Sequence, residues 1–170
     1  MNMIFTLVSE ATLETLAMVG FSTVFSLILG LPLGILLCVT DGETGIMKKP
    51  VLNQVLTRIV NVLRSFPFMI LMILLFPLSR KIVGTSIGTT ATIVPLSIAA
   101  APFVARIIET ALKEVDPGVV QAARAMGSTN MQIIWKVLLP EAMPSLVSGI
   151  TLTIINLIGY SAMAGAIGGG

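Results

Sequence analysis

The segment QAARAMGSTNMQIIWKVLLP (residues 121–140) separates two long uncharged runs, and its pattern predicts two short helices. Asp116 is suited to cap the first helix, and Pro117 takes its first position, where the missing N–H costs nothing. Gly127 suits the left-handed turn that ends this helix. Each helix has roughly ten residues, or about 15 Å, which is half of what a bilayer span needs. Because helices this short are marginal alone in water, we expect their apolar faces to be docked against another surface.

The second short helix begins at a predicted capping box of Thr129 and Gln132, and we expect Pro140 to end it. Apolar residues recur at helical spacing and predict one buried stripe on each helix. The stripes are Val119, Ala122, Ala123 and Met126 in the first helix, and Met131, Ile134, Trp135 and Leu138 in the second. Gln121 and Arg124 fall outside the first stripe.

The composition predicts a membrane protein. Of the 170 residues, 55% are hydrophobic and only 11% are charged, whereas a soluble domain has about a quarter of charged residues. The mean hydropathy is +1.02. A net charge of +2 gives no argument for nucleic acid as a partner. The chain has no histidine, which removes the usual general base and the commonest metal ligand, so we expect no catalytic residues, no metal and no cofactor.

Long uncharged runs predict an all-α polytopic fold with four visible transmembrane helices. The predicted spans are 15–40, 61–78, 82–105 and 145 to about 165. Residues 41–58 are predicted as a loop, and Arg80 and Lys81 as a polar turn. Beyond Arg106 we expect the third helix to leave the membrane, with Glu109 and Lys113 paired at i, i+4 and facing water.

The basic residues predict the orientation. Four lie in residues 41–64 and four in 106–141, whereas two lie in 79–83 and neither terminus has any. The positive-inside rule then places the first and third polar regions in the cytoplasm and the N-terminus outside. The two short helices are therefore predicted to be cytoplasmic.

Two interpretations of the two-helix segment follow from its pattern. It is either a helical linker on the membrane surface or a docking element for a soluble partner. Ala122 and Ala123 favour docking, because small side chains permit close contact. The segment also resembles the signature loop of the membrane subunits of binding-protein-dependent ABC importers, which runs Glu-Ala-Ala, then Gly, then an aliphatic residue and Leu-Pro. The matching residues are Ala122, Ala123, Gly127, Val137, Leu139 and Pro140.

Gln121 stands where this family usually has Glu, and it keeps the length and the hydrogen-bond acceptor but loses the charge. The resemblance implies that residues 117–140 couple the membrane domain to a separate ABC ATPase dimer. The implied coupling residues are Gln121, Ala122, Ala123, Arg124, Gly127, Val137, Leu139 and Pro140. Closure of the ATPases would then switch the spans from inward- to outward-facing.

A narrower resemblance covers nearly the whole chain. The stretches that carry it are RSFPFMILM (64–72), IVGTSIG (82–88), IVPL (93–96), AAPFVARIIETAL (100–112) and GYSAMAGAIG (159–168). They look like the membrane subunit of the bacterial methionine importer. That family implies the bacterial inner membrane, a homodimer with five spans per subunit, and an extracytoplasmic substrate-binding protein. The family's fifth span does not appear before Gly170, so we expect a transmembrane domain (1–170) that is truncated at its C-terminus.

The fourth span offers candidates for a substrate path, namely Asn156, Tyr160, Ser161 and Met163. An amphipathic ring beside a thioether suits the passage of an apolar amino acid. The alternative is interfacial anchoring of Tyr160 and ordinary packing of Met163.

The charged residues and the absence of a phosphate-binding motif bear on other classes of function. A membrane enzyme needs ionisable residues at membrane depth, and every charged residue lies near a span end or in a loop. No G-x-x-x-x-G-K-[ST] sequence occurs, so ATP hydrolysis is assigned to a partner subunit. A permease for another amino acid or small solute, a channel or scaffold subunit, and a non-functional truncated fragment remain as alternatives.

Overall fold

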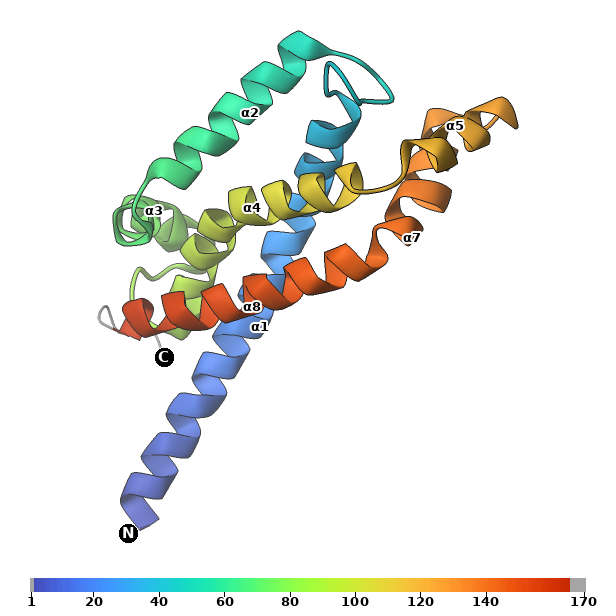
Figure 1. Ribbon diagram of the computed structural model, residues 1–170. Helices are drawn as coiled ribbons and strands as arrows, with labels where there is room; N and C mark the ends of the chain where they lie inside the picture. The colour runs from blue at the N-terminus through green and yellow to red at the C-terminus, as the bar shows by residue number, and fades with distance from the viewer. Residues whose placement is uncertain (1, 166–170) are drawn as a thin grey trace.

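The computed structural model describes residues 2–165, and all regular structure in this range is helical (Figure 1). The elements in chain order are α1 (Asn2–Val39), α2 (Pro50–Ser65), α3 (Phe68–Val83), α4 (Thr89–Lys113), α5 (Pro117–Ala125), α6 (Asn130–Ile133), the π-helical turn η1 (Ile134–Leu138), α7 (Leu139–Glu141) and α8 (Met143–Gly165). Within the described residues, α1, α4 and α8 are long and apolar enough to cross a membrane, and α2 and α3 count as a fourth span if taken together. The predicted all-α polytopic fold is confirmed.

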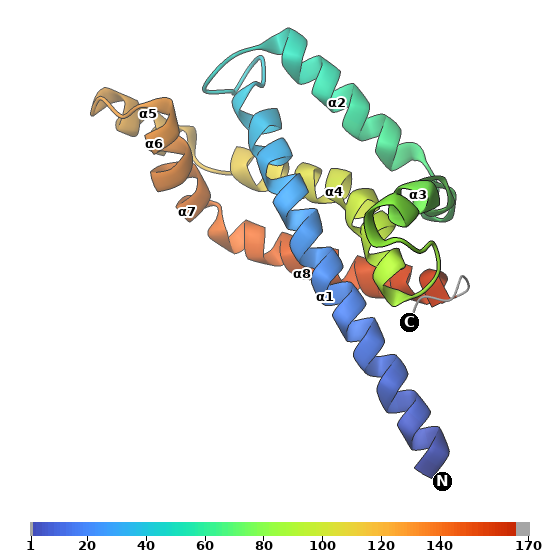
Figure 2. The same cartoon turned by 180° about the vertical axis from the view of Figure 1, so that it is seen from behind.

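Helix α4 lies at the centre of the bundle and contacts α1, α2, α3 and α8 (Figure 2). Glycines allow two of these contacts to be close. A Cβ atom at Gly34 of α1 would lie 2.6 Å from the carbonyl oxygen of Ala105, and one at Gly149 of α8 would overlap the side chain of Ile107. Small residues let membrane helices approach each other in this way. The packing of α1 and α8 on α4 therefore depends on these positions.

The predicted second span, 61–78, is wrong as a continuous helix. Helix α2 ends at Ser65, and α3 begins after a bend of 104°. Phe66 is extended, with φ −74° and ψ 133°, because the ring of Pro67 disfavours helical geometry in the residue before it. The predicted loop 41–58 is also wrong in its second half, since Pro50 takes the first position of α2, where proline is well tolerated.

Several other helix boundaries also differ from those predicted. Helix α1 begins at Asn2 rather than near residue 15, so its 38 residues extend about 57 Å, and its N-terminal part projects from the bundle (Figures 1 and 2). Arg80 and Lys81 are helical and belong to α3. Helix α4 begins only at Thr89, because Gly84 and Gly88 adopt φ values of 85° and 106°. Helix α8 agrees with the predicted fourth span, and the glycines 168–170 lie outside the described residues.

A buried apolar cluster joins the two-helix segment to the bundle. It contains Cys38 and Val39 at the end of α1, Ile108 and Leu112 of α4, and Ala142 and Leu146 around the start of α8. Ala123, Ile133, Ile134 and Leu138 of the segment also belong to it. The segment is therefore docked on the ends of α1 and α4, as helices this short require.

Candidate functional site

The caps of the two-helix segment 117–140 form as predicted. The backbone N–H of Gly118 donates to Asp116 Oδ1 at 2.8 Å, which caps α5. Gly127 has φ 81° and makes the left-handed turn after α5. Thr129 and Gln132 form the full capping box, because each backbone N–H donates to the other residue's side-chain oxygen. Local sequence therefore fixes both helix starts and the turn between them.

Pro140 does not end the second helix, so this prediction is wrong. The chain widens into the π-helical turn η1, in which the N–H of Leu139 donates to the carbonyl of Ile134. Pro140 then sits near the start of α7, and the N–H of Ala142 donates to Leu138 O at 3.0 Å. A π-turn relieves the clash that a proline ring would make with the preceding turn of a regular helix. The segment consequently leads into α8 almost without interruption.

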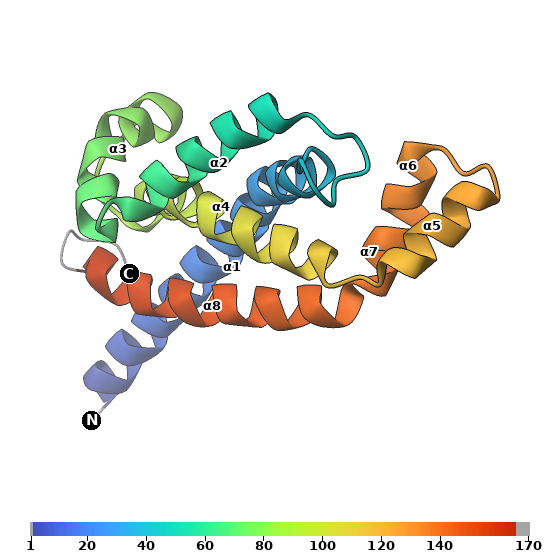
Figure 3. The same cartoon turned by 45° about the horizontal axis from the view of Figure 1, so that its top comes forward.

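Only part of each predicted stripe is buried. Ala123, Ile134 and Leu138 are buried as expected, and Ile133 joins them although it lay outside the stripe. The prediction is wrong for the other members, which are exposed: Val119, Ala122, Met126, Met131 and Trp135. The reason is geometric, since the hairpin of α5 and α6 projects from the bundle and touches it along one side only (Figure 3). Large apolar side chains of the segment stay uncovered, with Met126 80%, Met131 65% and Trp135 56% exposed.

Arg124 connects the segment to the loop that follows α1. Its Nη2 donates to the carbonyl oxygen of Ile46 at 2.9 Å. The loop is itself held by a backbone hydrogen bond of 2.8 Å from Met47 N to Val39 O. Gln121 is exposed and lines a cavity of about 330 Å³ between α5 and this loop. These two predicted coupling residues therefore face the first loop.

The remaining coupling candidates occupy three different environments. Gly127 is exposed at the outer turn. Val137 and Leu139 are half-buried and pack against the cluster beneath the segment. Pro140 is exposed and lines, with Trp135 and others, an apolar cavity of about 550 Å³ between the segment, α1, α4 and α8. The structure thus gathers the eight candidates in one projecting unit, and their role in coupling stays a prediction.

A network of charges ties α4 to α2 and to the first loop. Lys113 Nζ lies 2.8 Å from Asp41 Oδ2 and 2.8 Å from Glu109 Oε1. Arg106 donates to the other Glu109 oxygen at 2.6 Å and to Asn61 Oδ1 at 2.8 Å. The predicted Glu109–Lys113 pair is confirmed, but Glu109 is buried rather than facing water, since its two oxygens are held by two cations.

Asp41 was not found from the sequence, because no local spacing relates it to Lys113. The hydrogen bond from Lys113, followed by that from the backbone N–H of Thr44, holds the pKa of Asp41 well below its usual range. Among residues 2–165, no group of three or more histidine, cysteine, aspartate or glutamate residues is arranged to hold a metal ion.

The four candidates for a substrate path do not share one environment. Asn156 and Tyr160 are half-buried, and Met163, at helical spacing from them, is 45% exposed. Tyr160 stacks on Phe68 of α3, with 4.2 Å between ring centroids and 7° between ring planes. Ser161 is buried and donates to Ile158 O at 2.7 Å, so its hydroxyl is already satisfied within α8. The stacking partner Phe68 was missed, because only the bend at Pro67 brings α3 to this place.

Comparisons with known proteins agree with this arrangement. The family model of the binding-protein-dependent transport system inner membrane component matches residues 30–170. The probable D-methionine transport system permease protein MetI of Pasteurella multocida is 53% identical over 167 residues, which are 98% of this chain and 76% of that protein. The D-methionine transport system permease protein MetI of Escherichia coli K12 is 53% identical over 153 residues, which are 89% of this chain and 70% of that protein.

A solved structure gives the same result in three dimensions. A chain of the MetNI methionine ABC transporter, in inward-facing conformations, matches with a TM-score of 0.97 and 49% identity, and the match covers 100% of this chain and 78% of that chain. An amino acid ABC transporter matches with a TM-score of 0.70 at 22% identity, which speaks for the fold alone. This chain belongs to the family of binding-protein-dependent transport system inner membrane components.

Proposed function

We propose that this chain is the permease subunit of an ATP-driven importer of methionine. The observation that carries the proposal is the identity of 53% across 98% of the chain to a permease named for D-methionine transport, together with the TM-score of 0.97 to a chain of a methionine ABC transporter. The same relatives support a second copy of the chain as partner. A substrate-binding protein outside the membrane would deliver the amino acid.

The energy for transport would come from a separate ATPase. The sequence has no phosphate-binding loop of the G-x-x-x-x-G-K-[ST] type. The segment 117–140 offers a surface for such a partner, because Met126 and Met131 are exposed on it. Large flexible methionines suit the core of a protein–protein contact. The opposite side of the segment packs on the bundle, so a force applied to the segment would be transmitted to the membrane helices.

Three connections would carry that force into the membrane. Ala123 and Leu138 pack on the ends of α1 and α4. Arg124 bonds to the loop after α1, and α7 leads directly into α8. A displacement of the segment by the ATPase would therefore move α1, α4 and α8 together. Such movement in two facing subunits gives alternating access to a path between them.

Uptake of radiolabelled methionine tests the proposal. The full chain and its ATPase would be produced in cells that lack their own methionine importers. We expect saturable uptake that disappears when the ATPase carries a substitution that blocks hydrolysis. Uptake of a different amino acid would favour a permease of other specificity. A chain that never co-purifies with an ATPase would instead support a channel or scaffold subunit.

A further inference from the structure

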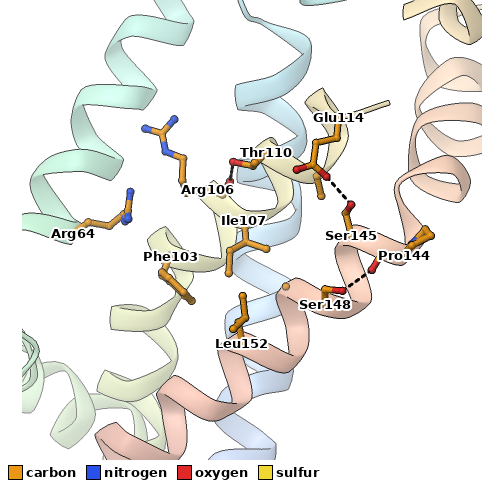
Figure 4. A pocket seen from close by; sticks show the side chains of 12 residues that line it. Arg64, Phe103, Arg106, Ile107, Thr110, Glu114, Pro144, Ser145, Ser148 and Leu152 are labelled. Atoms are coloured by element: carbon orange, nitrogen blue, oxygen red, sulfur yellow. Dashed lines mark hydrogen bonds between the residues drawn. The ribbon is translucent and has the colours of Figure 1, made fainter. Parts of the chain in front are cut away.

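A polar cavity separate from the two-helix segment lies between α2, α4 and α8 (Figure 4). Its volume is about 480 Å³. Two arginines reach it, Arg64 from the last turn of α2 and Arg106 from α4. Figure 4 shows both side chains entering the space between these two helices. Two cations that face each other repel, unless an anion lies between or beside them.

The acidic side chains nearby do not balance both arginines. Glu109 uses one oxygen for Arg106 and the other for Lys113, and Lys113 also binds Asp41, so these four charges neutralise one another. Glu114 lines the far end of the cavity, eight residues or about 12 Å along the chain from Arg106, and accepts a hydrogen bond of 2.6 Å from Ser145. Arg64 forms no ion pair within residues 2–165. Arg64 is therefore the arginine of this cavity that has no carboxylate partner among the described residues, and Glu114 is the carboxylate that has no cationic partner there.

Arg64 is exposed at this cavity, so its guanidinium group is open to a ligand. Asn61, one turn before Arg64 on α2, accepts from Arg106 Nη2 at 2.8 Å, which fixes the end of α2 beside α4. Arg106 lies seven residues, or about 10 Å, before the end of the α4 span. Arg106 is therefore held in place by Glu109 and Asn61, beside an Arg64 that is open to a ligand.

The remaining lining fits an amphiphilic ligand. Phe103 and Ile107 of α4 and Leu152 of α8 form an apolar wall, which Figure 4 shows on one side of the arginines. Ser148 of α8 adds a hydroxyl group, although this hydroxyl already donates to Pro144 O at 3.1 Å. Guanidinium groups bind carboxylates and phosphates with paired hydrogen bonds, and apolar walls accept an aliphatic side chain.

We propose that this cavity is an oxyanion site in which Arg64, assisted by Arg106, holds the carboxylate of the transported amino acid while its side chain lies on Phe103, Ile107 and Leu152. The choice of cargo rests on the proposed function. The phosphate of an anionic lipid has the same chemistry and is the other source of an oxyanion for a membrane protein. Arg64 supplies the unpaired charge, and Arg106 is already oriented by Glu109 and Asn61.

Protection from an arginine-specific reagent tests the site without requiring transport. The full chain in nanodiscs of neutral lipid would be treated with phenylglyoxal, and modification of each arginine would be followed by peptide mass spectrometry. We expect saturating methionine to slow the modification of Arg64 about tenfold, the effect of one charge-assisted contact. Methioninamide, which lacks the carboxylate, should not slow it. Arg58 is the matched control, since it is exposed on the same helix and does not line the cavity.

The outcomes distinguish a cargo carboxylate from a lipid phosphate. Protection by methionine in neutral discs supports the cargo carboxylate. Protection only in discs that contain phosphatidylglycerol overturns the cargo assignment and identifies the oxyanion as lipid phosphate. Equal modification of Arg64 and Arg58 under all conditions overturns the site altogether. If the chain takes up methionine but Arg64 is not protected, the proposed site is wrong and the proposed function stands. If Arg64 is protected but no uptake occurs, the proposed function is wrong and the site stands.

Discussion

Lys113, in the last turn of α4, lies 2.8 Å from Asp41 in the loop after α1, although 72 residues separate them in the chain. The same ammonium group lies 2.8 Å from Glu109, which in turn binds Arg106. The loop held by Asp41 also receives the hydrogen bond from Arg124 of α5. This ion pair therefore fixes the loop on which the two-helix segment rests.

Replacing Asp41 should loosen this loop and make the stability of the folded chain less sensitive to low pH. Asp41→Asn removes the charge that binds Lys113, and we expect the free energy of unfolding to fall by about 1 kcal/mol, as for a partly exposed ion pair. The pKa of Asp41 is lowered in the folded chain. The ion pair therefore stabilises the folded chain above the unfolded pKa of about 3.9, and this contribution is lost as the pH falls below that value.

Thermal unfolding of the detergent-solubilised chain between about pH 6 and pH 3 measures this effect. The melting temperature of the unsubstituted chain should drop more steeply below about pH 4 than that of Asp41→Asn. Glu43→Gln is the control, because Glu43 is exposed in the same loop and its side chain forms no ion pair in the described part of the chain. Parallel curves for all three proteins would contradict the prediction.

Ala122 and Ala123, which are adjacent in α5, should respond differently to replacement by aspartate. Ala123 is 3% exposed in the cluster beneath the segment, so Ala123→Asp should destabilise the chain by roughly 3 kcal/mol and undock the segment. Ala122 is exposed, and Ala122→Asp should leave the melting temperature within about 1 °C, since surface changes have small effects.

Transport measurements test whether the exposed residues of the segment have a role beyond stability. If the exposed side of the segment binds an ATPase, Ala122→Asp should reduce methionine uptake and ATPase co-purification in a protein that is otherwise as stable as the parent. Gly127→Asp should do the same and also strain the turn, where φ is 81°. Normal uptake by both variants would show that this side of the segment makes no functional contact.

Close packing of α1 on α4 predicts a sharp difference between two glycines. A side chain at Gly34 would meet Ala105 and Ile108 at 2.6–2.8 Å, whereas nothing lies within 4 Å of a Cβ at Gly20. We expect Gly34→Val to lower the stability by about 1–3 kcal/mol through overpacking, and Gly20→Val to have little effect. Guanidinium or thermal unfolding monitored by circular dichroism compares them. Equal losses would mean that the α1–α4 contact is looser than described.

The capping residues show which parts of this fold can be predicted from sequence. Asp116, Gly127 and the Thr129–Gln132 box act within one helical turn, so their spacing was sufficient. The bend at Pro67 was missed because proline is common within membrane helices, as Pro32, Pro95 and Pro102 show by remaining helical here.

Burial was harder to predict than helix position. Periodicity identified Ala123 and Leu138 as core, but it could not show that Met126 and Trp135 stay exposed. Asp41 as a second partner of Lys113 and Phe68 as the partner of Tyr160 could not be predicted, since only the packing of distant helices brings them together. The candidate site was therefore located by sequence, and its contacts required the structure.

The predicted orientation can be tested with single cysteines in a chain carrying Cys38→Ser. Ser9→Cys lies on the projecting part of α1 and Met126→Cys on the exposed side of the segment. The basic residues favour the cytoplasm for residue 126 and the outside for residue 9. In intact cells a membrane-impermeant maleimide should therefore label position 9 alone. Labelling of position 126 before lysis would contradict the orientation and, with it, coupling to a cytoplasmic ATPase.

Two candidate roles of Tyr160, packing and contact with the cargo, can be separated by different substitutions. Its ring stacks on Phe68, and such a pair contributes about 0.5–1.5 kcal/mol beyond the area that it buries. Tyr160→Ala and Phe68→Ala should each lower stability, and the double variant should lose less than the sum of both. Tyr160→Phe keeps the ring and removes only the hydroxyl. If the hydroxyl contacts the cargo, Tyr160→Phe should raise the methionine concentration for half-maximal uptake while the melting temperature stays unchanged. If uptake by Tyr160→Phe equals that of the parent, the ring serves packing between α8 and α3 and the hydroxyl lies off the path.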